Sequence, residues 1–137
     1  MPPRLDALPK GYQMPPSTFE LSPEWVRDYV AAVEDEAIGA LDGDLVPPMA
    51  VAALAVRSLL EGAELPPGAI HLGQEMALLK PVRAGERLAV QAHVASRGER
   101  QGWVLMGIDL NVEDEDHSPV MTSRATVTMP VGREGER

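Results

Sequence analysis

The sequence PPMAVAALAVRSLLEG, residues 47–62, decides how this 137-residue chain folds. Pro47 and Pro48 favour the first turn of a helix, where a backbone N–H is not needed, and Gly62 is typical of a helix end. From Met49 to Val56 no residue is polar on any helical face. This composition predicts a helix that other elements enclose on all sides, and its alanines let neighbouring backbone approach closely.

The chain from Ile70 onward changes to the two-residue period of half-buried strands. Apolar side chains alternate with other side chains over 88–95, 104–112 and 124–129. The connections PVRAGE, SRGERQG and EDEDHSP contain turn residues, so each strand is expected to pair with the next in an antiparallel meander. An apolar helix that precedes such strands needs their sheet to curl around it.

The remaining segments are organised around this unit. Residues 1–17 contain five prolines and predict an extended, irregular arm, and residues 132–137 predict a frayed, charged tail. Residues 18–131 are expected to form one domain. Its first helix begins at the Ser-Pro pair 22–23, a cap followed by a first helical residue, and is expected to end near Gly39.

Composition excludes several classes of function. The net charge of -9 repels nucleic acid and anionic membrane surfaces, and the absence of cysteine excludes disulfides and thiolate chemistry. The longest apolar run, Leu45 to Val56, is too short to span a membrane, and the N-terminus lacks the pattern of a signal peptide. We therefore expect a cytoplasmic protein with no nucleic-acid or membrane partner, no metal and no cofactor.

Three segments resemble the MaoC-like dehydratases, and among them the group related to the fatty-acid-synthase-type dehydratase domain. They are FELSPEWVRDYVAAVEDEAIG, LVPPMAVAALAV and IHLGQEMALLKPVRAGERLAV, and the likeness spans about residues 18–131. The resemblance implies an α+β hot-dog fold, in which an antiparallel sheet wraps one central helix. It also implies paired hot-dog units that bind an acyl-CoA or acyl-ACP thioester between them, and (R)-specific enoyl-thioester hydratase or dehydratase activity.

The catalytic loop of that family is missing here. Its members use an Asp and a His from a D-x-N-P-x-H loop between the two helices to activate water. In this chain residues 40–44 read ALDGD, and no histidine precedes His71. The resemblance therefore implies a degenerate subunit that keeps the thioester groove and complements a catalytic MaoC-like partner.

Other functions stay open at this point. A self-sufficient homomeric hydratase or dehydratase would use Asp44 or Asp42 with His71, although two Asp around a Gly also make an ordinary turn. A non-enzymatic module that binds an acyl ligand would need no acid–base pair. A hot-dog thioesterase is disfavoured, because the central helix has no carboxylate before Glu61. Whether the chain is an enzyme, and whether it forms homo-oligomers or heteromers, is left open by the sequence.

The candidate site residues fall into two groups. Candidates for binding the acyl thioester lie at the start of the central helix and on the strand that follows it: Pro48, Met49, Ala52, His71, Gly73 and Gln74. A backbone N–H at this helix start can polarise a thioester carbonyl. Candidates for contacting the phosphates of CoA or an acidic carrier protein are Lys80, Arg83 and Arg87, whose alternative role is to keep a hairpin soluble.

Two further histidines are interpreted as non-catalytic. His93 lies in register with Gln91 on the side of its strand that faces away from the core, which predicts a solvated or interface position. His117 belongs to the EDEDHSP turn, where alternating side chains do not converge, so a solvated turn is preferred over a metal site.

Overall fold

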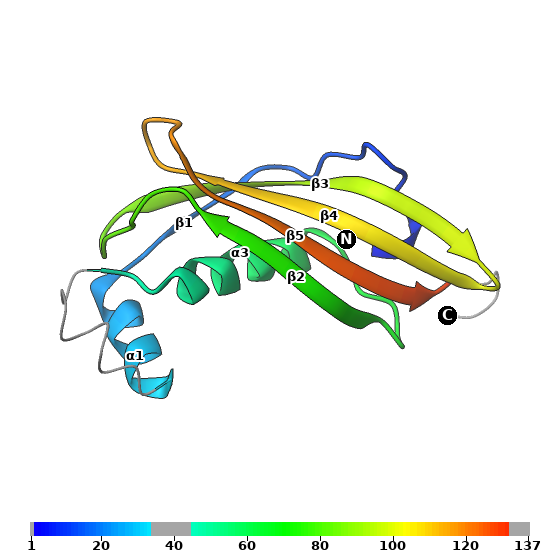
Figure 1. Ribbon diagram of the computed structural model, residues 1–137, viewed down its shortest axis with the longest axis horizontal. Helices are drawn as coiled ribbons and strands as arrows, with labels where there is room; N and C mark the ends of the chain where they lie inside the picture. The colour runs from blue at the N-terminus through cyan, green and yellow to red at the C-terminus, as the bar shows by residue number, and fades with distance from the viewer. Residues whose placement is uncertain (1, 34–44, 132–137) are drawn as a thin grey trace.

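The computed structural model describes residues 2–33 and 45–131, which form a curved antiparallel sheet with one long helix on its concave side (Figure 1). The sheet has five strands in the order β1-β3-β4-β5-β2. The elements follow one another along the chain as η1 (Leu5–Ala7), β1 (Ser17–Glu20), α1 (Pro23–Val33), α3 (Pro48–Gly62), β2 (Ile70–Leu78), β3 (Arg87–Arg100), β4 (Trp103–Glu113) and β5 (Pro119–Pro130).

The strand order corrects the predicted meander. Strands β3, β4 and β5 pair in sequence, but β2 pairs with β5 and forms one edge of the sheet. The β3–β4 turn is tight, with Gln101 and Gly102 both at positive φ, which suits the twist of a hairpin. The connection 79–86 leaves β5 after the Leu79 N–H donates to Val120 O, and it then hydrogen-bonds to Val46 and Leu21, ahead of the two helices. It carries the chain from the edge strand β2 across to β3.

Helix α3 has the predicted limits, but it is not enclosed on all sides. One face packs under the sheet and is fully buried at Ala50, Val51 and Ala55. The opposite face carries an apolar row at helical spacing, in which Met49 is 57% and Leu60 is 47% exposed. The prediction of a fully enclosed helix is therefore wrong for the single chain, because the sheet covers α3 from one side only. We call this exposed row the α3 stripe; its members are Met49, Ala53, Val56 and Leu60.

The proline-rich arm is part of the core rather than an appendage. Leu5, Leu8 and Met14 are buried. The backbone N–H of Gly11 donates to Val94 O at 2.8 Å, and that of Met14 donates to Ala92 O at 2.9 Å, so the arm lines the edge of β3. Strand β1, which the sequence did not predict, continues this pairing with β3 over residues 17–20.

Helix α1 begins as predicted. The backbone N–H of Trp25 donates to Ser22 Oγ at 3.1 Å, so Ser22 caps a helix whose first residue is Pro23. The predicted end near Gly39 and the predicted tail at 132–137 lie outside the described residues. Among the described helices, none combines the length and the apolar character that a membrane crossing requires.

Candidate functional site

One end of the molecule brings together the beginnings of both helices and the connection between β2 and β3 (Figure 1). The backbone N–H of Val46, just before α3, donates to Val82 O at 2.9 Å. Leu21, just before α1, exchanges backbone hydrogen bonds with Gly85 and Glu86 at 2.6 and 2.9 Å. Two motifs far apart in the sequence, the proline pair and the PVRAGE turn, are thus neighbours in space.

The start of α3 presents an unusual donor arrangement. Pro47 and Pro48 have no backbone N–H, so Met49 provides the first one in the helix. Early N–H groups of a helix have no partner within it and carry the positive end of the helix dipole. The side chains of Pro48 and Met49 are exposed beside this donor. Contact of a thioester with this helix start stays a prediction.

The predicted contact at Ala52 is placed differently. Ala52 is 3% exposed and packs in the core, whereas the next residue, Ala53, lies on the exposed α3 stripe. Its predicted role in binding stays a prediction, and in the single chain the exposed alanine of this turn is Ala53.

Strand β2 carries the other predicted substrate contacts. His71 and Gln74 pair with Val127 and Ala125, which are both buried, so these two side chains lie on the concave side of the sheet. Gln74 Nε2 donates to Ser123 Oγ at 2.9 Å. Gly73 is next to a bulge in the strand and faces the convex side. Within the described residues β2 pairs with β5 alone, so its outer edge is free.

The three candidate cations do not form one cluster. Lys80 bonds Asp114, a buried carboxylate that also accepts backbone N–H bonds from Asp116 and Ser118 at 3.0 Å. The hydrogen bond between them raises the pKa of Lys80 and lowers that of Asp114. Lys80 therefore ties the β2–β3 connection to the β4–β5 turn.

Arg83 and Arg87 lie at different points near the same end. Arg83 pairs with Leu45 through an isolated bridge, which places it beside the entry to α3, and its backbone N–H donates to Glu86 Oε2 at 2.5 Å. Arg87 is exposed and in register with Glu20 on β1. Contact of these cations with phosphate stays a prediction.

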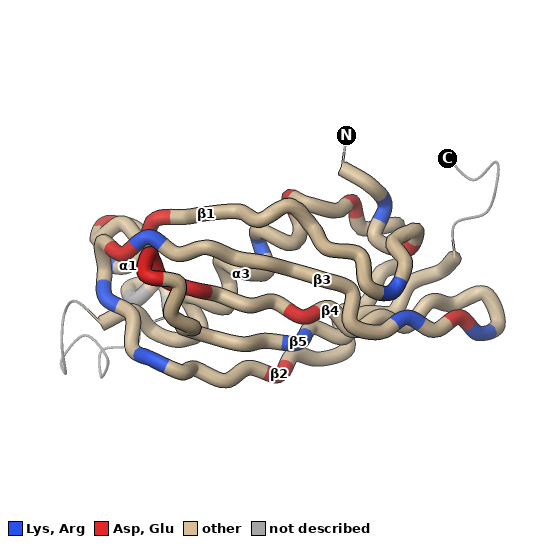
Figure 2. Tube along the Cα trace, turned by 90° about the horizontal axis from the view of Figure 1, so that it is seen from above, with Lys and Arg blue, Asp and Glu red and all other residues tan. Residues whose placement is uncertain are grey.

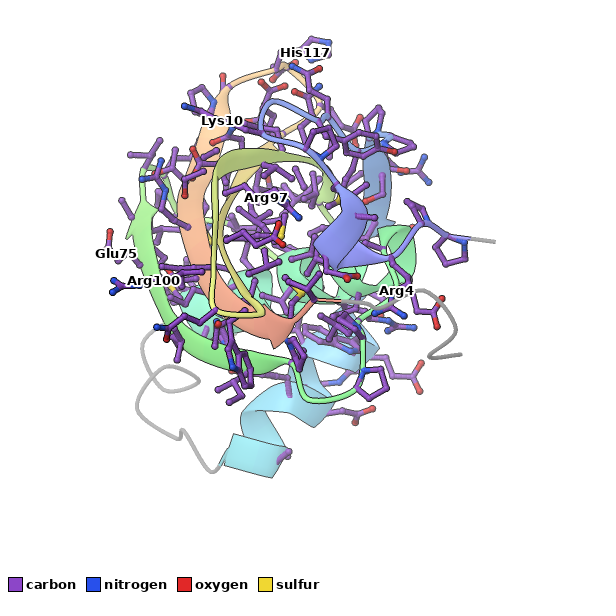
Figure 3. The ribbon with its side chains drawn as sticks, turned by 90° about the vertical axis from the view of Figure 1, so that its right-hand side faces the viewer. Arg4, Lys10, Glu75, Arg97, Arg100 and His117 are labelled. Atoms are coloured by element: carbon purple, nitrogen blue, oxygen red, sulfur yellow. The ribbon has the colours of Figure 1, made fainter. Side chains whose placement is uncertain are left out.

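The other two histidines lie on the convex face of the sheet and in the β4–β5 turn. His93 is on the convex side of the sheet, as predicted, with Nε2 3.6 Å from Asp109 Oδ2. His117 is 87% exposed in the β4–β5 turn and points away from the molecule (Figure 3). Asp42 and Asp44, the predicted carboxylate candidates, lie outside the described residues.

Comparison with known proteins identifies the family. The model of the FAS1-like dehydratase domain region matches residues 9–123. The chain belongs to this family. A UPF0336 protein from Mycolicibacterium paratuberculosis is 27% identical over 143 residues, which cover 93% of this chain and 82% of that protein.

Solved structures of similar proteins show the fold. The MaoC-like dehydratase from Rhodospirillum rubrum superposes with a TM-score of 0.78 at 18% identity, over 96% of this chain and 99% of that chain. The (3R)-hydroxyacyl-ACP dehydratase complex HadBC from Mycobacterium tuberculosis gives a TM-score of 0.72 at 22% identity, over 91% and 100%. A hot-dog-like protein from Thermanaerovibrio acidaminovorans gives 0.63 at 18% identity, over 90% and 84%. The predicted α+β hot-dog fold and MaoC-like resemblance are confirmed.

Sequence reasoning missed two features of this family member. The α3 stripe has the spacing i, i+4, i+7 and i+11, which is visible in the sequence, but an all-apolar helix does not reveal which face stays uncovered. The convex side of the sheet brings Asp109 and Arg124 into a bidentate pair at 2.6 and 3.0 Å. That pair depends on strand register, which the sequence pattern did not provide.

Proposed function

We propose that this chain is an acyl-thioester-binding hot-dog subunit that lacks its own acid–base pair and completes an (R)-specific enoyl-CoA or enoyl-ACP hydratase or dehydratase. The observation that carries the proposal is the position of the histidines. None precedes His71, and the other two lie on the convex sheet face and in the β4–β5 turn. Adding water to an enoyl thioester needs a base and an acid within hydrogen-bond reach of the substrate.

The exposed apolar surface of the concave side supports acyl binding. On the concave side of the sheet, β2 presents Met76, which is half-buried, and Leu78, which is 41% exposed. An acyl chain needs an apolar lining of this kind, and the Met49 N–H at the start of α3 is suited to hold a thioester carbonyl. The chain would thus contribute binding while another subunit contributes the acid and the base.

A partner hot-dog subunit explains why these surfaces are uncovered in the single chain. The free edge of β2 and the α3 stripe would each promote association of the single chain, because an unpaired strand edge can pair with another strand and an exposed apolar face can pack against another surface. A second hot-dog unit that pairs along β2 would cover both. The structural relative HadBC is a complex, and we propose a heteromer with a catalytic MaoC-like subunit here, with a homo-oligomer as the alternative.

Activity measurements on the purified chain test this proposal. We expect no hydration of crotonyl-CoA or of a longer enoyl-CoA above the uncatalysed rate, and hydration by the complex when a subunit with a D-x-N-P-x-H loop is co-purified from the native host. Robust hydration by the chain alone would contradict the proposal. If that activity were lost in His71→Ala and kept in the matched control His93→Ala, the self-sufficient alternative would replace it.

A further inference from the structure

The convex face of the sheet consists of cross-strand rows whose members strand pairing fixes. Three adjacent rows each have one residue from β3, β4, β5 and β2, in that order. The charged row is His93, Asp109, Arg124 and Glu75. The small row is Ser96, Gly107, Thr126 and Gly73. The mixed row is Gly98, Leu105, Thr128 and Ile70. Figure 2 shows the alternation of acidic and basic positions on β4, β5 and β2.

In the charged row, positions at equal distances on either side of the line between β4 and β5 have side chains of opposite charge type. Asp109 on β4 is an acid, and its mirror position on β5 is the base Arg124. His93 on β3 mirrors the acid Glu75 on β2. Arg124 bonds Asp109 through Nε and Nη2, which leaves its Nη1 outside that pair. A second copy turned about this line would therefore place a base opposite every carboxylate of the row.

In the mixed row, a large side chain on one side of the line lies at the mirror position of a small residue on the other side. Leu105 is 51% exposed, and its mirror position is the shorter Thr128. Ile70 is 50% exposed, and its mirror position is Gly98, where an added Cβ would meet nothing within 4 Å. Large apolar side chains thus lie opposite small residues at both positions, and the charges and shapes point to the same axis.

We propose that the convex face binds a second copy of this chain about a two-fold axis that runs parallel to the strands between β4 and β5. Asp109 then faces the partner's Arg124, and Leu105 packs against the partner's Thr128. Ile70 lies opposite the partner's Gly98 at the flank of this contact, where the two sheets curve apart. This contact is isologous, because the same face serves both copies.

The curvature of the sheet sets the strength of this contact. The sheet curls about α3, which runs roughly along the strands, so two convex faces approach most closely in a band over β4 and β5 (Figure 1). From strand spacing and rise, two strands of about nine residues cover about 10 Å by 30 Å, or about 300 Å² per copy. Stable interfaces bury about 800 Å² per partner. The association should therefore be weak and depend on concentration.

This contact is separate from the proposed enzyme interface. The free edge of β2 and the α3 stripe do not belong to the band over β4 and β5. Loss of the convex contact would leave those surfaces intact, and failure of the acyl-thioester proposal would leave the convex contact intact.

Sedimentation equilibrium of the full chain over a wide concentration range tests the inference. The wild-type apparent mass should rise toward twice its low-concentration value, whether that baseline is one chain or a pair formed along β2. Leu105→Lys should abolish the rise. Leu79→Lys, a matched control at a position that is 53% exposed and outside the three rows, should keep it.

A charge exchange makes the test specific for the axis. Asp109→Arg and Arg124→Asp each place like charges across the axis, so neither variant alone should show the rise. An equimolar mixture of the two restores opposite charges at both crossings and should associate again. Circular dichroism checks that each variant is folded. A flat wild-type curve, a Leu105→Lys curve equal to wild type, or a mixture that stays at the baseline mass would overturn the inference.

Discussion

Replacing the two large exposed members of the α3 stripe, Met49→Ser with Leu60→Ser, should weaken assembly with the proposed partner and leave the fold intact. Complete burial of a Met or Leu side chain is worth about 1.5–3 kcal/mol. The exposed fractions are 57% and 47%, so their burial by a partner contributes about 1.5–3 kcal/mol per chain. At about 1.4 kcal/mol for each tenfold change, the double variant should bind about 10- to 150-fold more weakly.

A binding titration with the catalytic subunit from the native complex measures this change. If the partner is a second copy, both chains carry the substitutions, and the same arithmetic doubles the free-energy loss in a sedimentation experiment. Arg57→Ser is a matched control on the same helix, because that side chain is exposed and pairs only with Glu61 in the described hydrogen-bond network. Equal affinities for the double variant, the control and the wild type would refute the assignment of the α3 stripe to an interface.

Three further changes test the frame that carries the site. Leu5→Ala should lower the free energy of unfolding by about 2–4 kcal/mol in denaturant titrations, because the side chain is 1% exposed; an unchanged stability would show that the arm is dispensable. Ser22→Ala should cost about 1 kcal/mol through loss of the α1 cap, and an unchanged midpoint would count against that cap. Asp114→Asn should lower the melting temperature at neutral pH. The pKa of Asp114 is held below its usual 3.8, chiefly by the hydrogen bond from Lys80, so the ionised form stabilises the fold above that value and the benefit disappears as the pH falls through the lower folded pKa. The gap between variant and wild type should narrow in acid, and a gap independent of pH would contradict this assignment.

Local sequence signals predicted both helix starts, the end of α3 and most strands. Pro23 and the proline pair at 47–48 fix helix starts through backbone chemistry that is independent of the rest of the fold. The alternation of apolar and other side chains located β3, β4 and β5, because successive side chains of a strand point to opposite faces of the sheet. The position of β2 depends on where the connection 79–86 finds hydrogen-bond partners, and two of them, Leu21 and Val46, precede the two helices. The turn residues alone therefore do not predict which strand β2 pairs with.

Features of the site that depend on distant contacts were beyond the sequence pattern. Lys80, grouped with Arg83 and Arg87 by closeness in the chain, bonds a carboxylate 34 residues away. Nearness to the helix start predicts a contact at Ala52, but the direction from which the sheet covers α3 decides that Ala53 is the exposed residue. Both differences follow from tertiary packing, which outweighs sequence proximity.

The same packing argues that acyl binding and proton transfer can reside on different subunits. Thioester binding by this chain would rely on the Met49 N–H and on apolar side chains, which the start of α3 and the α3 stripe provide without any ionisable group. Proton transfer needs two ionisable groups in the same space. His71 is the one described histidine on the concave side, and it lies at the free edge of β2, where a partner hot-dog unit would dock. Any second group that acts beside it is therefore more readily supplied across that edge than from this chain, and a complex can lose the pair from one subunit while both keep the groove.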